Sequence, residues 1–143
     1  MNNILEQISG STSSHAVNYS DEVAQQLKTI LNDMTQKTSD FSGAMLSSVD
    51  GIAWAEKLPQ GFDKHRFAAM SSAFLALSDN LSAEAGTGNT ENAIIEGLAG
   101  KIFILHAGQN LLLTVFIRAD ANFGMTLAYA KQAIEDIMSI HGI

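Results

Sequence analysis

The most apolar stretch of the chain is Leu111-Leu112-Leu113-Thr114-Val115-Phe116-Ile117-Arg118, which follows the turn residues Gly108-Gln109-Asn110. A strand that faces water on one side alternates apolar and polar residues. A strand covered on both sides reads instead as a nearly continuous apolar run. We therefore expect residues 111–118 to form a central strand, in a sheet with helices on both faces.

Four shorter segments with extended patterns precede this strand, in two pairs. Asp50-Gly51 supplies the positive φ angles of a tight hairpin within the first pair, and Ala99-Gly100 marks a turn within the second. Strands joined by tight turns run antiparallel. The sequence therefore predicts a five-stranded antiparallel sheet. Its first four strands are expected at residues 41–48, 52–56, 93–98 and 101–106.

Helix signals enclose these strands. Ser20 is a good N-cap, and the helix that follows it is expected to run to about Lys37. A last helix is expected to begin at Asp120 as its cap and to stop at Gly142. The buried faces are predicted to be Val23, Leu27, Ile30, Leu31 and Met34 in the first helix, and Phe123, Leu127, Ala130, Ile134, Ile137 and His141 in the last.

The segment from about Asp63 to Ala85 predicts a further helix with two apolar stripes. One stripe is large (Phe67, Met70, Phe74, Leu77 and Leu81), and the other is small (Ala69, Ala73, Ala76 and Ala83). We expect the large stripe to lie on the sheet, and the small stripe to let the backbone of a second copy approach closely. The fold class is thus α/β (α+β), in the order helix, two strands, helix, three strands, helix.

The length of 143 residues corresponds to one domain. Residues 1–19 include the run Ser9-Gly10-Ser11-Thr12-Ser13-Ser14, which cannot bury apolar area. We therefore expect residues 1–19 to be a flexible N-terminal arm and residues 20–143 to be the folded domain.

The composition excludes several classes of partner. The net charge is −7 with only eight Lys and Arg residues, so a basic patch for nucleic acid or for an anionic membrane is not expected. No run of apolar residues is long enough to span a bilayer, and the N-terminus lacks the pattern of a secretory signal. Cysteine is absent, which excludes disulfides and thiolate metal sites. A cytoplasmic protein is the simplest interpretation.

Gly100-Lys101 has only a superficial likeness to a phosphate-binding loop. That motif needs a glycine where this chain has Ile95, and Ser or Thr where it has Ile102. The loop Gly86-Thr87-Gly88-Asn89-Thr90 precedes a strand rather than a helix N-terminus, so it is expected to be a linker.

Catalytic and metal-binding patterns are also missing. Asp50 is explained by its place in a turn, and no serine lies in a nucleophile elbow. The four histidines (His15, His65, His106 and His141) have none of the spacings of a metal site. We therefore expect a protein that is not an enzyme and that holds no cofactor or metal.

The order of elements, together with three segments, resembles the roadblock / dynein light-chain family over roughly residues 20–141. The segments are Gly43-Ala44-Met45-Leu46-Ser47-Ser48-Val49-Asp50-Gly51, Leu113-Thr114-Val115-Phe116-Ile117-Arg118-Ala119-Asp120 and Asn122-Phe123-Gly124-Met125. The resemblance implies a profilin-like fold and a homodimer in which the second helices pair and the third strands meet edge to edge. Bacterial relatives of the mutual gliding protein B type bind a small Ras-like GTPase across the paired helices. They stimulate hydrolysis without donating a catalytic residue.

These considerations give two sets of candidate residues. We expect the dimer interface to contain Ala69, Met70, Ala73, Ala76, Leu77, Ile94 and Glu96. We expect the GTPase to contact exposed positions beside the apolar arc of the second helix, namely His65, Ala68, Ser72, Ala76 and Asp79. Two alternatives remain open: a purely structural dimerisation module that links other proteins, and a sensor of small ligands.

Overall fold

The computed structural model describes residues 18–143, which contain five strands and three helices. All neighbouring strands are antiparallel, in the spatial order β2-β1-β5-β4-β3. The predicted fold and its order of elements are confirmed. The elements are α2 (Asp21–Thr35), β1 (Phe41–Ser48), β2 (Ala53–Lys57), α3 (Lys64–Glu84), β3 (Ala93–Glu96), β4 (Gly100–Ala107), β5 (Leu111–Arg118) and α4 (Phe123–Met138).

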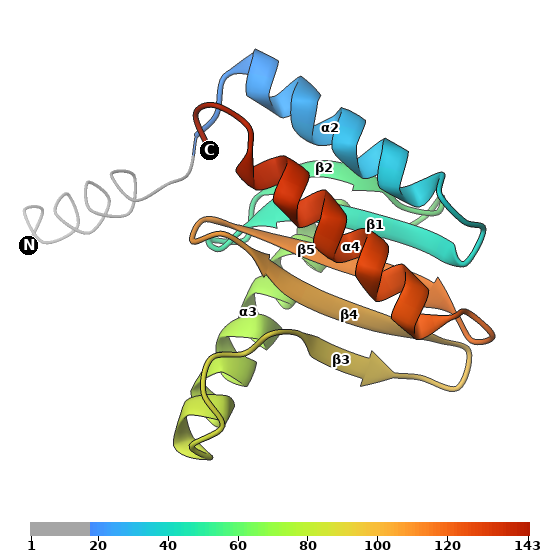
Figure 1. Cartoon of the computed structure of the whole chain (residues 1–143), viewed down its shortest axis with the longest axis vertical. Coiled ribbons are helices and arrows are strands. Elements are labelled where there is room, and N and C mark those ends of the chain that lie inside the picture. The colour runs from blue at the N-terminus through green and yellow to red at the C-terminus, as the bar shows by residue number, and fades with distance from the viewer. Residues whose placement is uncertain (1–17) are drawn as a thin grey trace, which may run out of the picture.

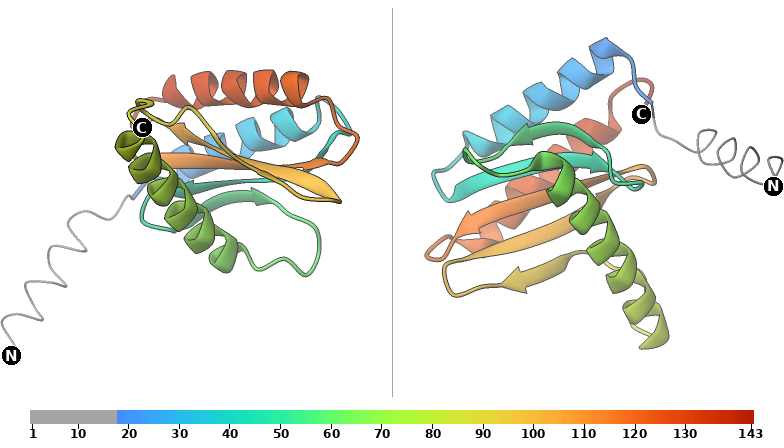
Figure 2. Two further views of the ribbon diagram at one scale, coloured as in Figure 1. Left: turned by 90° about the horizontal axis from the view of Figure 1, so that it is seen from below. Right: turned by 180° about the vertical axis from the view of Figure 1, so that it is seen from behind.

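Strand β5 occupies the centre of the sheet, and every residue from Leu111 to Ile117 is buried. Helices α2 and α4 lie side by side on one face of the sheet, and α3 crosses the other face (Figures 1 and 2). This arrangement is what the continuous apolarity of the strand predicts, because neither of its faces meets water.

The larger core lies between the α2–α4 layer and the sheet. Leu27 and Leu31 of α2 and Ile137 of α4 are buried there. They pack against the alternate strand residues Phe103 and Leu113. Each such side chain contributes about 1.5–3 kcal/mol on full burial, so this face supplies most of the hydrophobic stabilisation.

The last helix begins and ends differently from the prediction. Its N-cap is Asn122, whose side chain accepts a hydrogen bond from the Met125 amide at 3.0 Å. Asp120 instead accepts a bond from Nη2 of Arg118 at 3.1 Å, which leaves it outside the helix. The helix ends at Met138, before Gly142, so the exposed His141 is not part of its buried face.

The hairpin turns agree with the predicted residues at β1–β2 and shift slightly at β3–β4. Gly51 has a φ of 88°, and Ser48 donates to the Asp50 carboxylate, which accounts for Asp50 as a turn residue. Strand β3 ends at Glu96 rather than at residue 98. The turn therefore precedes Gly100, which is already the first residue of β4.

Residues 1–17 of the predicted N-terminal arm lie outside the described residues. Tyr19, also assigned to the arm, is partly buried and packs edge-on against Trp54 with their ring centroids 5.0 Å apart. Burial raises the pKa of the Tyr19 hydroxyl. The packed part of the chain therefore begins at or before Tyr19.

Candidate protein-interaction surface

Helix α3 is firmly placed at its N-terminus. Asp63 caps it by accepting hydrogen bonds from the amides of His65 and Arg66, at 3.0 and 3.2 Å. One turn later Phe67 lies between two other rings: it stacks on Phe62 at 5.2 Å and meets Phe116 of β5 edge-on at 5.5 Å. This aromatic cluster fixes where the helix starts on the sheet.

The face of α3 that docks on the sheet differs from the prediction. Ala68, Ser71 and Leu75 are buried, at spacings of three and four residues. The large stripe that we expected on the sheet is mostly outside: Met70, Leu77 and Leu81 are 47%, 65% and 68% exposed, and Phe67 and Phe74 are partly buried at its edge.

Two of the three docked residues are small, and the third is the large Leu75. Leu75 packs with Ile104 and Leu112, and it forms the second, smaller core of the molecule. On the same sheet face, the hydroxyls of Ser47 and Thr114 are buried without a hydrogen-bond partner among the described residues. The α3 layer thus buries less apolar surface than the α2–α4 layer does.

Polar contacts hold the other flank of α3. The Ser72 hydroxyl donates to the carbonyl of Val49 in the β1–β2 turn. Asp79 lies 2.9 Å from Nε2 of His106 at the end of β4. A Cβ atom added at Gly51 would lie 3.5 Å from the Cα of Ala69, so this turn sits directly against the helix.

The side of α3 that points away from the sheet is largely apolar. Successive residues turn by about 100°, which places Ala73 nearly opposite the docked residues Ser71 and Leu75. We call this side the α3 outer face. Its apolar residues are Ala69, Met70, Ala73, Ala76, Leu77 and Leu81, all exposed, and the exposed polar residues Arg66, Asn80 and Glu84 lie among them. The C-terminal end of the helix also extends past the edge of the sheet at β3 (Figures 1 and 2).

Strand β3 forms the sheet edge next to this overhang. Within the described chain it pairs only with β4, so its other edge offers free backbone groups. Its exposed residues include Ile94 and Ile95, at 45% and 43% exposure, and Glu96. A free strand edge with exposed isoleucines is a favourable site for pairing with another chain.

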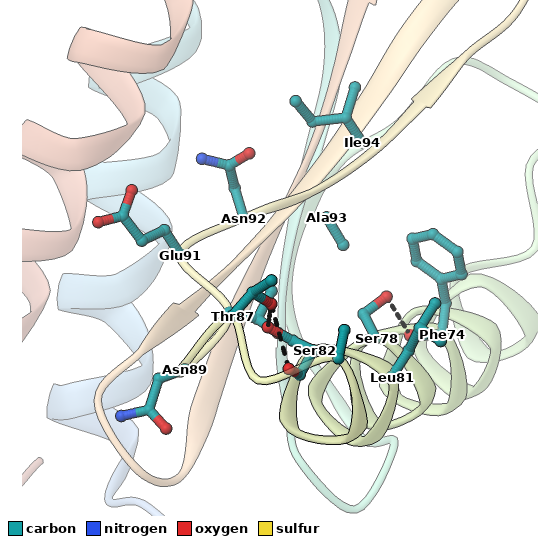
Figure 3. Close-up of a pocket in the computed structure, with 12 residues that line it drawn as sticks. Phe74, Ser78, Leu81, Ser82, Thr87, Asn89, Glu91, Asn92, Ala93 and Ile94 are labelled. Carbon is teal, nitrogen blue, oxygen red and sulfur yellow. Dashed lines mark hydrogen bonds between the residues drawn. The ribbon is translucent and has the colours of Figure 1, made fainter.

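A groove of about 500 Å³ separates the end of α3 from β3 and from the loop that joins them (Figure 3). Phe74 and Leu81 line its helix side, and Ala93 lines its strand side. The side chain of Ile94 points away from α3, as expected from its pairing with Phe103, which faces the α2–α4 layer. Ile95 pairs with Ile102 and therefore faces the α3 side.

The predicted interface residues all lie on exposed parts of this region. Those on α3 belong to the α3 outer face, and Ile94 and Glu96 lie on β3. Sequence reasoning missed Leu81, which it had placed on the sheet, and Ile95. The alternation of the strand was the available signal for Ile95, because two adjacent isoleucines cannot both face one core.

One of the predicted partner-contact residues is wrong. Ala68 is fully buried against the sheet, so it cannot contact another protein. His65 and Ala76 are exposed, whereas Ser72 and Asp79 are partly buried and hold the bonds to Val49 and His106 described above. Exposed apolar side chains of the adjacent turn, Val49 at 40% and Ile52 at 53%, widen this flank.

Groups that could serve chemistry are scattered over the described residues. Across residues 18–143, no three His, Asp or Glu side chains come together as metal ligands would. Arg118 is bonded to Asp120, and the guanidinium lowers the pKa of that carboxyl. Among residues 18–143, no helix has the length and apolarity needed to cross a bilayer.

The sequence profile of the Roadblock/LC7 domain matches residues 27–116. The chain belongs to the Roadblock/LC7 domain family. Relatives of this chain are found in Methanocaldococcus jannaschii. Two uncharacterised proteins of that archaeon are 34% and 33% identical to this chain over 104 residues, which cover 73% of this chain and 90% of each relative.

Solved structures confirm the roadblock fold. MglB of Myxococcus xanthus superimposes with a TM-score of 0.77 at 17% identity, covering 85% of this chain and 91% of MglB. The gliding protein MglB of Thermus thermophilus gives a TM-score of 0.72 at 18% identity, over 86% and 93% of the two chains. Profilin of Schizosaccharomyces pombe matches with a TM-score of 0.61 at 12% identity, over 80% of this chain and 98% of the profilin, so the profilin-like fold is also confirmed.

Proposed function

We propose that this Roadblock/LC7 chain is a homodimeric regulator, without enzymatic activity of its own, that binds a small Ras-like GTPase and modulates its GTP hydrolysis. The observation that carries the proposal is the α3 outer face. A helix that covers a sheet normally exposes polar residues, whereas α3 exposes Met70, Leu77 and Leu81. Contiguous exposed apolar surface of this kind marks interaction sites.

The geometry favours a second copy as the first occupant of this face. In a two-fold dimer each patch meets itself, so one apolar helix and one free strand edge satisfy both subunits. Pairing β3 with β3 of the partner would remove both free edges. It would also bring the overhanging end of each α3 across the other subunit. The exposed alanines, such as Ala73, would allow the two helices to approach closely.

The substitution Ala73→Glu tests this dimer. Because Ala73 points away from the sheet, a glutamate there leaves the fold of each subunit intact and places two like charges near the two-fold axis. Sedimentation should show a monomer. The matched control is Ala128→Glu, at an exposed position of α4 on the opposite face of the sheet, which should leave the dimer unchanged. A persistent dimer of the Ala73→Glu variant would exclude this interface.

We place the GTPase on the flank of α3 that faces the β1–β2 turn. His65, Ser72, Ala76 and Asp79 lie along this flank, and Val49 and Ile52 add apolar surface beside it. In the proposed dimer both copies of the flank would lie near the paired helices, so one GTPase could contact both subunits. Support comes from the fold shared with MglB and from what resemblance to the roadblock family implies.

The proposed mechanism is conformational. Of the arginines in ordered elements, Arg118 is engaged by Asp120 at 3.1 Å, and Arg66 is in the first turn of α3. We assign neither a role as an arginine finger. Binding would instead favour the GTPase conformation in which its own catalytic groups are aligned, which is a shift between existing states.

A pull-down from native extract, with GDP or with a non-hydrolysable GTP analogue, tests the partner assignment. The variant His65→Glu should lose the GTPase while remaining folded and dimeric, because His65 is exposed on this flank and lies outside the α3 outer face. Ala128→Glu is the matched control. Ser72 is a poorer probe, because its hydroxyl anchors the helix to Val49. Recovery of the GTPase by both variants, or by neither, would contradict this location.

Turnover measurements separate the regulator from a structural dimerisation module. If the captured GTPase hydrolyses GTP at the same rate with and without the chain, the chain is a scaffold. A changed single-turnover rate that is lost in His65→Glu supports the regulator.

A further inference from the structure

The face of the sheet opposite α3 carries a groove that the proposed function does not use. Helices α2 and α4 lie side by side there and run antiparallel (Figure 1). One cleft of about 660 Å³ lies between the start of α2 and the end of α4, and a second of about 400 Å³ lies towards the other end of the pair. Ile30 and Asp136 line both clefts, so the two adjoin, and we call them together the α2–α4 groove.

The floor of the α2–α4 groove is apolar. Ile30 and Ile140 are only partly buried by the core below them, and Met34 and Tyr129 continue the floor towards the far end. The groove follows α2, whose 15 residues correspond to about 20 Å of helix. Its length therefore suits a helix of about four turns lying along it.

The rim of the groove is acidic. Glu22 and Asp33 border it on α2, and Asp136 borders it on α4. Within residues 18–143, none of these three carboxylates has a Lys, Arg or His nitrogen within 4.0 Å. Asp136 accepts only a neutral bond from Nε2 of Gln132, at 3.2 Å. Within residues 18–143, the basic side chains that line the groove are Lys37 at one end and His141 at the other.

We propose that the α2–α4 groove binds a basic amphipathic helix of another protein. Apolar residues spaced i, i+4 and i+7 would lie over Ile30 and Ile140, and flanking Lys or Arg side chains would meet Glu22, Asp33 and Asp136. This surface is separate from the dimer and GTPase surfaces on α3, so the proposal stands whether or not that function holds.

Charge decides against two other occupants. A second copy of the chain would bring the same three carboxylates to the groove and would meet like charge. The chain's own segment before residue 18 has Glu6 as its only Asp, Glu, Lys or Arg residue, so it lacks the cations that the rim requires.

A pair of synthetic peptides on the full-length protein tests the proposal. Both are helical, about four turns long, with leucines at i, i+4 and i+7; one carries lysines beside the leucines and the other carries glutamates. Fluorescence anisotropy measures binding, and methyl NMR locates it. The basic peptide should bind and shift the methyl resonances of Ile30 and Ile140, and the acidic peptide should not bind.

Charge reversal of the rim provides the decisive comparison. Asp33→Lys with Asp136→Lys should weaken binding of the basic peptide at least about tenfold, since each reversal replaces an attraction between opposite charges by a repulsion between like charges. The control, Glu91→Lys with Glu135→Lys, changes the net charge equally at exposed positions outside the groove, and should weaken it less than about twofold. The acidic peptide should bind the reversed rim, which also shows that this variant is folded.

Four results would overturn the proposal. If the reversed-rim variant and its control weaken binding of the basic peptide equally, the peptide is attracted by net charge alone. Unchanged Ile30 and Ile140 resonances would place the peptide elsewhere. Tighter peptide binding after deletion of residues 1–17 would show that the chain's own N-terminus fills the groove. A change of sedimenting mass in the reversed-rim variant would make the groove a contact between copies.

Discussion

Leu77 provides the most quantitative test of the α3 outer face. We predict that Leu77→Gln weakens the dimer strongly and leaves the fold of each subunit intact. Glutamine is about as good a helix former as leucine, so α3 keeps its local stability. Leu77 makes no contribution to either buried core cluster, because its side chain points away from the sheet.

The expected magnitude follows from how much of Leu77 is still exposed. Full burial of a leucine side chain contributes about 1.5–3 kcal/mol. With 65% of Leu77 exposed, about two thirds of that value, ~1–2 kcal/mol, remains to be gained on association. Both copies contribute in a symmetric dimer, which gives ~2–4 kcal/mol, or a dissociation constant raised between about 30-fold and about 700-fold.

Sedimentation velocity over a concentration series measures this dissociation constant directly. Thermal unfolding of the diluted, monomeric variant checks the fold, and its stability should lie within about 0.5 kcal/mol of the unchanged monomer. Met138→Gln is the matched control, because Met138 is also an exposed apolar residue, at 49%, but lies at the end of α4 on the opposite face. Met138→Gln should leave the dissociation constant of the dimer unchanged.

Three results would refute the reasoning. The dissociation constant of the dimer could be unchanged by Leu77→Gln. It could instead rise equally with Met138→Gln. Finally, the unsubstituted chain could be a monomer at every concentration. The first would move the interface away from α3, the second would indicate non-specific association through apolar surface, and the third would remove the homodimer altogether.

Other predictions concern the monomer. In the Ala73→Glu background, Leu75→Ala should cost about 2–5 kcal/mol in chemical denaturation because Leu75 is 1% exposed, whereas Leu77→Ala, one half-turn away, should cost less than about 1 kcal/mol. Arg118→Gln should raise the pKa of Asp120 towards its usual value in a carboxyl NMR titration. Because the Arg118 bond lowers that pKa, the pair stabilises the fold above the ordinary aspartate pKa and loses its effect as the pH falls through the lowered value. Deletion of residues 1–17 should leave the melting temperature almost unchanged, because the run from Ser9 to Ser14 can bury little and Tyr19, which packs on Trp54, is retained.

The sheet was predictable because its signals are local. A continuous apolar run identified β5 as the central strand, and Asp50-Gly51 located the first hairpin. The ends of helices are harder to predict where two neighbouring residues are both suited to cap the helix. Asp120 and Asn122 are both good caps, and the bond from Arg118 to Asp120 leaves the cap to Asn122.

The orientation of α3 was not predictable in the same way. Its large and small apolar stripes are both plausible core faces, and the hydrophobic pattern alone does not rank them. The choice depends on the surface below, where Leu75 packs with Ile104 and Leu112, and Ala68 and Ser71 are buried on the same side of the helix. Because this side of the helix docks on the sheet, Ala68 lies in the interior and is not a candidate partner contact.

The two layers of the molecule thus differ in what they leave for other proteins. The α2–α4 layer buries its large side chains against the sheet and keeps a narrow groove with acidic rims. The α3 layer docks through small residues and turns Met70, Leu77 and Leu81 outward. An isolated domain gains nothing from the outward side chains, because they remain hydrated. The arrangement becomes favourable once a second protein covers α3, so the docking of this helix is itself an argument that the chain acts as part of an assembly.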